Sequence, residues 1–279
     1  MNAQETSRGE GHDPLANAKL TGYWRPGFAA RYDACRPQPP SALADVLLRL
    51  ARTERPALVV DLGSGTGLST AFWGHRAREV IGIEPLDEMR RIAEENHGAA
   101  NVRFRAGVAQ ATGIPSGAAD VVTCAQSLHH MEPQGTLAEV ERILRPGGVF
   151  ATCDYDWPPV VDPDAEAAFF AFMDRVLALR ARHGIRSEQQ RWEKGEHVAR
   201  MQRHGFRYTR ELLLHHTEPC TATRWVGFAL SIGIVPPVLD LGIPEDELGL
   251  EAFRRAAERT FGDRALPWHV SYRIGVAIK

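Results

Sequence analysis

The sequence has few cysteines and no long apolar run. Its 279 residues include four cysteines, Cys35, Cys124, Cys153 and Cys220, and no C-x-x-C pair. Cysteines scattered in this way predict neither a disulfide framework nor a zinc site. No stretch reaches about 18 consecutive apolar residues, the length needed for a membrane span, and the first residues lack the pattern of a signal peptide. We therefore expect buried, reduced thiols, a cytoplasmic location and no membrane partner.

An excess of charge of one sign is also missing. The chain carries 33 basic and 35 acidic side chains, a net charge of -2. Because a nucleic-acid-binding protein needs a broad cationic face, nucleic acid is not expected as the main partner. Hydrophobic residues make up 44% and charged residues 24% of the chain, which is typical of a globular protein. The length suits one large domain that carries an insertion.

The chain divides into a short polar start and one domain. Residues 1–17 are polar and glycine-rich, and we expect them to be disordered. Residues 18–279 are expected to form the domain. Its first part, from Tyr23 to Pro37, is rich in aromatic and basic residues. A helix is expected next, with Ser41 as its N-cap residue.

From Pro56 onwards, short apolar runs alternate with amphipathic segments. The expected strands are 57–61, 79–84, 102–106, 119–125, 148–154, 206–214 and 269–278. The expected helices between the first five strands are 69–75, 87–96 and 133–144. This alternation predicts an α/β fold in which helices cover both faces of a parallel sheet.

After Asp154 the alternation stops and helices dominate. Asp162-Pro163 begins a long helix, a second is expected at about 188–204, and two more at 223–232 and 245–261. Residues 157–204 are more than a simple connection between strands requires, and they suit a cover over a ligand. This segment contains the basic cluster Arg180, Arg182, His183 and Arg186. The cluster suits either a bound carboxylate or phosphate or an ordinary solvated helix face.

The most informative motif is the run Asp61-Leu62-Gly63-Ser64-Gly65-Thr66-Gly67, which follows a strand and begins a helix. Glycines there allow a sharp turn and a close approach of the backbone to a ligand. Glu84 ends the next strand, where a carboxylate can accept both ribose hydroxyls of a nucleoside. A dinucleotide loop would need glycine at position 68, which is Leu68 here. The pattern therefore favours a nucleoside ligand other than NAD.

At these residues the chain resembles the class I S-adenosylmethionine-dependent methyltransferases. It is similar to their small-molecule branch, near the ubiquinone/menaquinone-biosynthesis and trans-aconitate enzymes. The resemblance covers about residues 23–154. Besides the glycine loop, it rests on Gly82-Ile83-Glu84-Pro85, Met89, Ile114-Pro115, Asp120-Val121-Val122, Leu128-His129-His130 and Leu144-Arg145-Pro146-Gly147-Gly148.

The resemblance implies a fold and a cofactor. The fold would be a Rossmann-like sheet of seven strands, mostly parallel with the last strand antiparallel, and a helical cover inserted after the fifth strand. The cofactor would be S-adenosyl-L-methionine, with its methionine part on the glycine loop, its ribose on Glu84 and its adenine beside Met89. The implied cofactor-binding residues are Asp61, Gly63, Ser64, Gly65, Gly67, Glu84, Pro85, Met89, Ala109, Gln110 and Gln126.

The implied activity is transfer of a methyl group to a small organic acceptor by O-, N-, S- or C-methylation, in specialised metabolism. We expect a monomer or a homodimer. One position departs from the family: Val108 stands where an acid usually accepts from the adenine amino group. The departure leaves two alternatives open. One is an enzyme that keeps the cofactor without transferring methyl, such as a pericyclase or decarboxylase, and the other is a catalytically silent cofactor-binding protein.

Candidate residues for the chemistry follow the fourth and fifth strands, because open α/β sheets bind ligands at the carboxyl ends of their strands. His129, His130 and Asp154 are the candidates for a general base. Contacts with the acceptor are expected from Tyr23, Trp24, Tyr32, His130, Tyr155, Trp157 and Trp192. No metal site is expected, since no further histidine or cysteine gives ligand spacing.

Overall fold

The structure is a computed structural model and describes residues 13–279. Most of the segment predicted to be disordered, residues 1–12, lies outside the described residues. For residues 13–17 that prediction is wrong, because helix α1 (Pro14–Lys19) begins there. Asp13 caps the helix by accepting from the backbone N–H of Leu15, and proline follows at the first helical position. Asn17 is only 5% exposed and donates to the carbonyls of His130 and Gln190.

Seven strands form a single sheet in the order β3-β2-β1-β4-β5-β7-β6. The strands are β1 (Leu58–Leu62), β2 (Glu79–Ile83), β3 (Val102–Arg105), β4 (Ala119–Ala125), β5 (Leu144–Tyr155), β6 (Tyr208–Cys220) and β7 (Leu266–Ile278). Strands β1 to β5 pair in parallel, and β7 runs antiparallel to both β5 and β6. The predicted fold, mostly parallel with an antiparallel last strand, is confirmed.

The central strands are buried on both faces, as their continuous apolar runs predict. Because side chains alternate along a strand, Val59 and Val60 enter different core clusters. Val59 packs with Leu47 on one face, and Val60 packs with Val140 and Met201 on the other. Helices on both faces thus hold the sheet and fix the carboxyl ends of its strands.

The helices largely follow the expected pattern. They are α2 (Phe28–Cys35), α3 (Ser41–Leu50), α4 (Leu68–Phe72), α5 (Asp87–His97), α6 (Pro133–Ile143), α7 (Pro163–Arg182), α8 (His197–His204), α9 (Ala222–Leu230), α10 (Pro236–Leu239), α11 (Glu245–Leu248) and α12 (Leu250–Phe261), with short 3-10 turns η1 (Leu128–His130) and η2 (Lys194–Glu196). Helix α2 was not predicted, and the helix expected from about residue 188 begins only at His197. Among residues 13–279, no helix is both long and apolar enough to cross a membrane.

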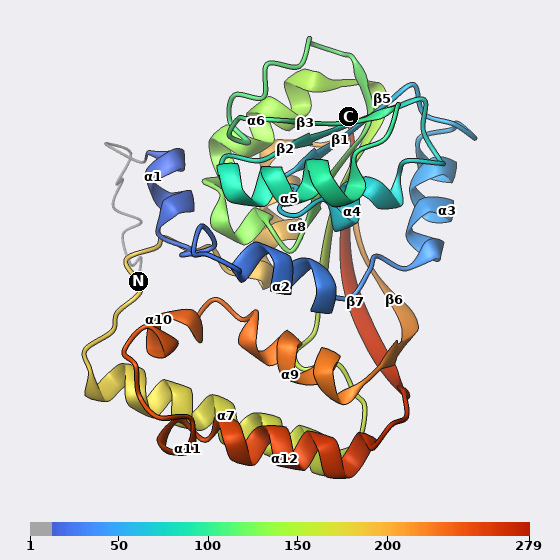
Figure 1. Ribbon diagram of the computed structural model, residues 1–279. Coiled ribbons are helices and arrows are strands. Elements are labelled where there is room, and N and C mark those ends of the chain that lie inside the picture. The colour runs from blue at the N-terminus through green and yellow to red at the C-terminus, as the bar shows by residue number, and fades with distance from the viewer. Residues whose placement is uncertain (1–12) are drawn as a thin grey trace, which may run out of the picture.

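The helical cover differs from the predicted segment 157–204. Helix α7 packs against α12 and α11, and α12 packs against α9, so residues 222–261 complete a layer below the sheet (Figure 1). Helix α8 instead packs on α6, β6 and β7. Helix α2 contacts both α5 and α9, and Figure 1 shows it between the sheet and the lower helices. The N-terminal part of the chain therefore connects the two halves of the molecule.

Candidate functional site

The glycine loop connects β1 to α4 in a conformation that suits glycine alone. Gly63, Gly65 and Gly67 have φ values of +64°, +55° and +94°, a left-handed region that other residues rarely adopt. A side chain at Gly63 would collide with Met131 and Ser127. At Gly65 only the methyl group of Met89 comes within 4.0 Å of the added atom. The backbone at Gly65 is thus open toward a cavity.

Asp61 lies beneath this loop, and its side chain is fully buried. Its carboxylate accepts hydrogen bonds from the hydroxyls of Ser69, Thr70 and Thr123, at 2.5, 2.7 and 2.8 Å. Burial raises the pKa of Asp61, although the three hydroxyls favour the charged form. Asp61 therefore ties the end of β1 to α4 and β4.

Glu84, at the end of β2, reaches back to the loop. Its carboxylate accepts from the backbone N–H groups of Gly65 and Leu86, both at 2.9 Å. Burial raises the pKa of Glu84 to about 7, against the effect of these two hydrogen bonds and of the nearby Arg90. A carboxylate that is half ionised near neutral pH is ready to accept from a ligand's hydroxyl groups.

The glycine loop and Glu84 border a first cavity, which gathers most of the predicted cofactor residues. Those that line it are Gly63, Ser64, Gly65, Glu84, Pro85, Met89, Ala109, Gln110 and Gln126. Asp61 and Gly67 do not line it: the Asp61 carboxylate is hydrogen-bonded below the loop, and Gly67 faces Phe104 and Ala93. Val108 also lines the cavity, and the buried amide nitrogen of Gln110 has no hydrogen-bond partner in the described part of the chain.

A second, larger cavity of about 1260 Å³ lies on the side of the cover. It meets the first cavity at six residues that line both, which we call the junction: Thr21, Tyr23, Tyr32, Arg36, Gln126 and Tyr155. Four of these come from the N-terminal segment around α2, whereas Gln126 directly follows β4 and Tyr155 ends the neighbouring strand β5. The junction therefore lies where the N-terminal segment meets the carboxyl ends of β4 and β5.

Most of the residues predicted to contact an acceptor border one of the two cavities. Tyr23, Tyr32 and Tyr155 belong to the junction, Trp157 and Trp192 line the second cavity, and His130 lines the first. Trp24 is the exception, and this prediction is corrected. It is 53% exposed, lines neither cavity, and donates its indole N–H to the carbonyl of Lys19. Trp225, Phe228 and Trp268 are fully buried and belong to the core.

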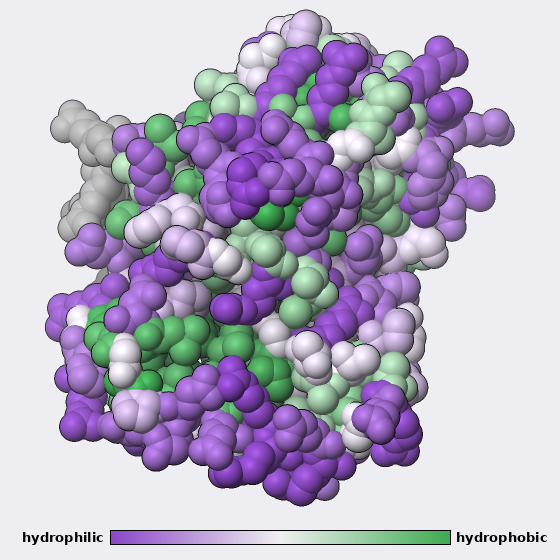
Figure 2. Space-filling view, viewed as in Figure 1, coloured by the Kyte–Doolittle hydropathy of each residue, from purple (hydrophilic) through white to green (hydrophobic). Residues whose placement is uncertain are grey.

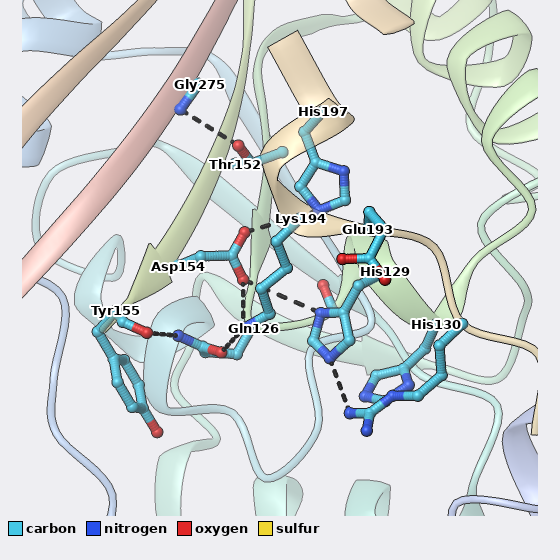
Figure 3. A network of polar contacts seen from close by, with 12 residues as sticks. Gln126, His129, His130, Thr152, Asp154, Tyr155, Glu193, Lys194, His197 and Gly275 are labelled. Atoms are coloured by element: carbon cyan, nitrogen blue, oxygen red, sulfur yellow. Dashed lines mark hydrogen bonds and ion pairs between the residues drawn. The ribbon is translucent and has the colours of Figure 1, made fainter. Parts of the chain in front are cut away.

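A buried polar network borders the second cavity at the end of β5 (Figure 3). Asp154 lies 3.1 Å from the ammonium of Lys194, which also donates to the Gln126 side chain at 2.5 Å. His129 and His197 approach the same carboxylate at 4.0 and 3.8 Å. Burial raises the pKa of Asp154, while the adjacent Lys194 lowers it.

Lys194 and His197 were not identified from the sequence. Both follow the cover helix α7 by more than ten residues, and neither belongs to a motif. Only the folded chain brings them to the end of β5. No group of three His, Cys, Asp or Glu residues within the described part of the chain has an arrangement that could hold a metal ion.

The two adjacent histidines face different cavities. His129 lines the second cavity and contacts Arg191, whereas His130 lines the first and contacts the Gln189 amide at 2.7 Å. Burial, followed by nearby positive charges, lowers the pKa of His130 to about 3 and that of His129 well below its usual range. Both rings are therefore neutral at pH 7 and bind a proton weakly.

Gln126 combines a strained backbone with a central position. Its φ of +53° lies in the left-handed region that non-glycine residues rarely occupy. Its backbone N–H donates to the carbonyl of Cys153, which connects the ends of β4 and β5. A non-glycine residue in this conformation costs about 1–3 kcal/mol, which the surrounding structure must compensate. Such residues are found most often at functional sites.

Comparisons with known proteins agree with this geometry. Residues 60–152 match a family model described as a methyltransferase domain. The chain is 29% identical over 123 residues to the uncharacterized methyltransferase YcgJ of Bacillus subtilis, covering 42% of this chain and 49% of that protein. It is 30% identical over 159 residues to "Probable S-adenosylmethionine-dependent methyltransferase CRG1" of Saccharomyces cerevisiae, covering 54% of each. The chain thus spans about half the length of these curated relatives.

Solved structures show the same fold over more of the chain. A protein of Anaeromyxobacter dehalogenans, provisionally named a type II methyltransferase, has a TM-score of 0.60 and 23% identity. The match covers 87% of this chain and 97% of that one. A phosphoethanolamine N-methyltransferase of Haemonchus contortus has a TM-score of 0.54 and 14% identity, covering 96% of this chain and 60% of that one. With its glycine loop, sheet order and family match, the chain contains a region, residues 60–152, that is similar to known methyltransferase domains.

Proposed function

We propose that the protein transfers a methyl group from S-adenosylmethionine to a small organic acceptor, by O-, N-, S- or C-methylation. One observation carries this proposal: the cavity bordered by the glycine loop and Glu84 meets a second cavity at six shared residues. Two ligands that must exchange a group need two compartments and one point of contact. The junction provides that point.

The residues of the first cavity fit the cofactor. Gly65 leaves the loop backbone open toward the cavity, and Glu84 brings a carboxylate to its edge. Gln110, which lines the same cavity as Met89 and Val108, offers a buried amide N–H₂ group that has no hydrogen-bond partner among residues 13–279. The cofactor, when bound, supplies a methyl group on a sulfonium. Glu84 would hold its ribose, the glycine loop its methionine part, and Met89 its adenine.

The junction residues then position the acceptor and exclude water. Methyl transfer of this kind depends mostly on positioning, since the reacting atoms must lie in line. Tyr23, Tyr32 and Tyr155 surround the contact between the cavities with aromatic rings. Aromatic faces also stabilise a nearby cation by about 0.5–2 kcal/mol.

Asp154 is the best candidate for a general base if the acceptor must lose a proton. Burial raises its pKa, whereas the pKa values of His129 and His130 lie far below neutral. We expect Asp154→Asn to slow methylation of such an acceptor by about 10²–10⁴-fold with unchanged affinity for S-adenosylhomocysteine. The same loss in His130→Gln, with Asp154→Asn fully active, would assign the role to the histidine.

The test of the function is formation of S-adenosylhomocysteine. The protein is titrated with S-adenosylmethionine and with NAD by calorimetry, then incubated with S-adenosylmethionine and a panel of hydroxyl, amine, thiol and acidic-carbon acceptors. We expect binding of S-adenosylmethionine alone, and acceptor-dependent formation of S-adenosylhomocysteine. Binding with a changed acceptor but no S-adenosylhomocysteine would indicate an enzyme that keeps the cofactor without transferring methyl. Binding of NAD instead would refute the cofactor assignment.

A further inference from the structure

Arg36 places a buried positive charge at the junction. The residue is only 6% exposed. Its Nε donates to the hydroxyl of Ser231 at 2.8 Å, and one terminal nitrogen donates to the carbonyl of the same serine at 2.7 Å. The other terminal nitrogen donates to the hydroxyl of Tyr155 at 2.5 Å. The rings of Tyr32, Trp157 and Phe228 lie within 4.5 to 5.3 Å of its central carbon.

None of these partners carries a negative charge. Among residues 13–279, no carboxylate lies within 4.0 Å of a nitrogen of Arg36. A guanidinium has five N–H groups, and three of them are used in the hydrogen bonds above. A buried charge without an opposite charge is destabilising, because the solvation lost on burial is not replaced by an ion pair. Since Arg36 lines both cavities, a bound ligand can supply the missing negative charge.

Arg191, an exposed residue of the segment between α7 and α8, adds a second cation. It lines the second cavity and contacts Nε2 of His129 at 3.2 Å, again without a carboxylate within ion-pair distance in the described part of the chain. Both Arg36 and Arg191 act electrostatically on Tyr23 and on Lys194, so the two guanidiniums surround the same region. The charge of Lys194 itself is already balanced by Asp154.

The other charged residues of the second cavity do not balance the positive charges of Arg36 and Arg191. Arg25 and Arg273 are paired with Asp240 and Asp156. Glu188 and Glu193 also line the cavity, but within the described residues neither forms an ion pair with Arg36 or Arg191. The cofactor would bring one more positive charge, its sulfonium, to the first cavity. An acceptor with a negative charge is therefore favoured over a neutral or cationic one.

Part of the wall of the second cavity is apolar. Ile185, Ile232, Ile234 and Pro237 line the second cavity. In Figure 2, hydrophobic surface gathers in a hollow over α10 and the end of α9. A ligand that contacts both regions needs an anionic group at one end and an apolar body at the other.

We propose that the methyl acceptor is an organic anion, a carboxylate or a phosphate ester with an apolar body, whose charged group is bound by Arg36 and Arg191. This inference rests on the proposed function only in calling the ligand an acceptor. The carboxylate of the cofactor itself is the other anion that the two guanidiniums can bind, so the test must distinguish the two sources.

The test uses protein saturated with S-adenosylhomocysteine, which fixes the contribution of the cofactor's carboxylate. Calorimetric titrations then compare benzoate, benzyl phosphate and the uncharged benzamide. We expect at least one anion to bind tenfold or more tightly than benzamide, and the tighter of the two anions identifies the headgroup. Arg191→Gln should remove this preference. Arg182→Gln, an exposed arginine paired with Glu247 and outside both cavities, should keep it.

Arg36→Lys tests the contribution of the Arg36 guanidinium, because lysine keeps the positive charge but lacks the planar set of N–H donors. We expect a loss of anion preference intermediate between Arg191→Gln and the unchanged protein. Equal affinity for benzamide and both anions would overturn the proposal, as would variants that lose affinity for S-adenosylhomocysteine but keep the anion preference. If S-adenosylhomocysteine itself does not bind, the proposed function fails, and the same titrations on the free protein still decide whether the anion site exists.

Discussion

At the scale of single residues, Glu84 has a direct consequence for cofactor binding. Its pKa of about 7 means that the carboxylate is protonated below neutral pH, mostly because of burial. The folded-state pKa is raised, so the contribution of Glu84 to stability is complete below the ordinary value of 4.5 and is lost as pH rises to about 7. Hydroxyl groups of a ribose bind the ionised form better. Cofactor binding should therefore release a proton near neutral pH.

We predict that affinity for S-adenosylhomocysteine rises roughly tenfold between pH 6 and pH 8, as Glu84 ionises. Calorimetry in buffers of different ionisation enthalpy would measure both the affinity and the released proton. The variant Glu84→Gln should bind more weakly and show little change over this range. A wild-type affinity that is the same at pH 6 and pH 8 would show that Glu84 does not contact the ribose in its ionised form.

At the scale of elements, two glycines allow backbone strain to be distinguished from obstruction of the first cavity by a side chain. Gly65 and Gly113 both have positive φ, +55° and +70°. No atom lies within 4 Å of a Cβ added at Gly113, and Gly113 lines neither cavity. A substitution at either position should cost about 1–2 kcal/mol of backbone strain. Only at Gly65 would the side chain also enter the first cavity.

We predict that Gly65→Val abolishes measurable binding of S-adenosylmethionine, whereas Gly113→Val binds normally. Chemical denaturation should show a similar loss of stability in both variants, which controls for strain. If Gly65→Val retains wild-type affinity in calorimetry, the loop does not border the cofactor as proposed.

The elements also show what the sequence could and could not reveal. The strands around Val59 and Val121 were predictable, because a continuous apolar run indicates a strand that is buried on both faces. The glycine loop was predictable because backbone conformation restricts the residue type. Helix α2 was missed, because its pattern of apolar residues gives no clear stripe and its partners α5 and α9 are distant in sequence. Lys194 and the uncompensated charge of Arg36 depend on tertiary contacts that no local pattern records.

At the scale of the whole molecule, buried neutral histidines make stability depend on pH. His197 is 4% exposed, and burial followed by the nearby Arg200 and Lys194 lowers its pKa to about 4. For a base with a depressed pKa, the stabilisation is complete above the unfolded-state pKa of about 6.5 and is lost as pH falls toward the folded value. Between these two pH values His197 is mostly protonated in the unfolded chain and mostly neutral in the folded chain.

We predict that the free energy of unfolding decreases between pH 7 and pH 5 by about 2 kcal/mol more in the wild type than in His197→Gln. Urea denaturation at the two pH values gives this difference, and effects of other titrating groups cancel in the comparison. An identical pH dependence in both proteins would indicate that His197 titrates normally.

The residues shared by the two cavities, described above as the junction, link what binds on one side to what binds on the other. Any rearrangement of Arg36 or Tyr155 that one ligand causes changes the wall of the other cavity as well. Such coupling is reciprocal, so the factor by which an acceptor changes cofactor affinity equals the factor by which the cofactor changes acceptor affinity. Because the junction belongs to both cavities, cofactor binding and acceptor binding form one thermodynamic cycle. The order in which the two ligands bind changes the route but not the overall affinity.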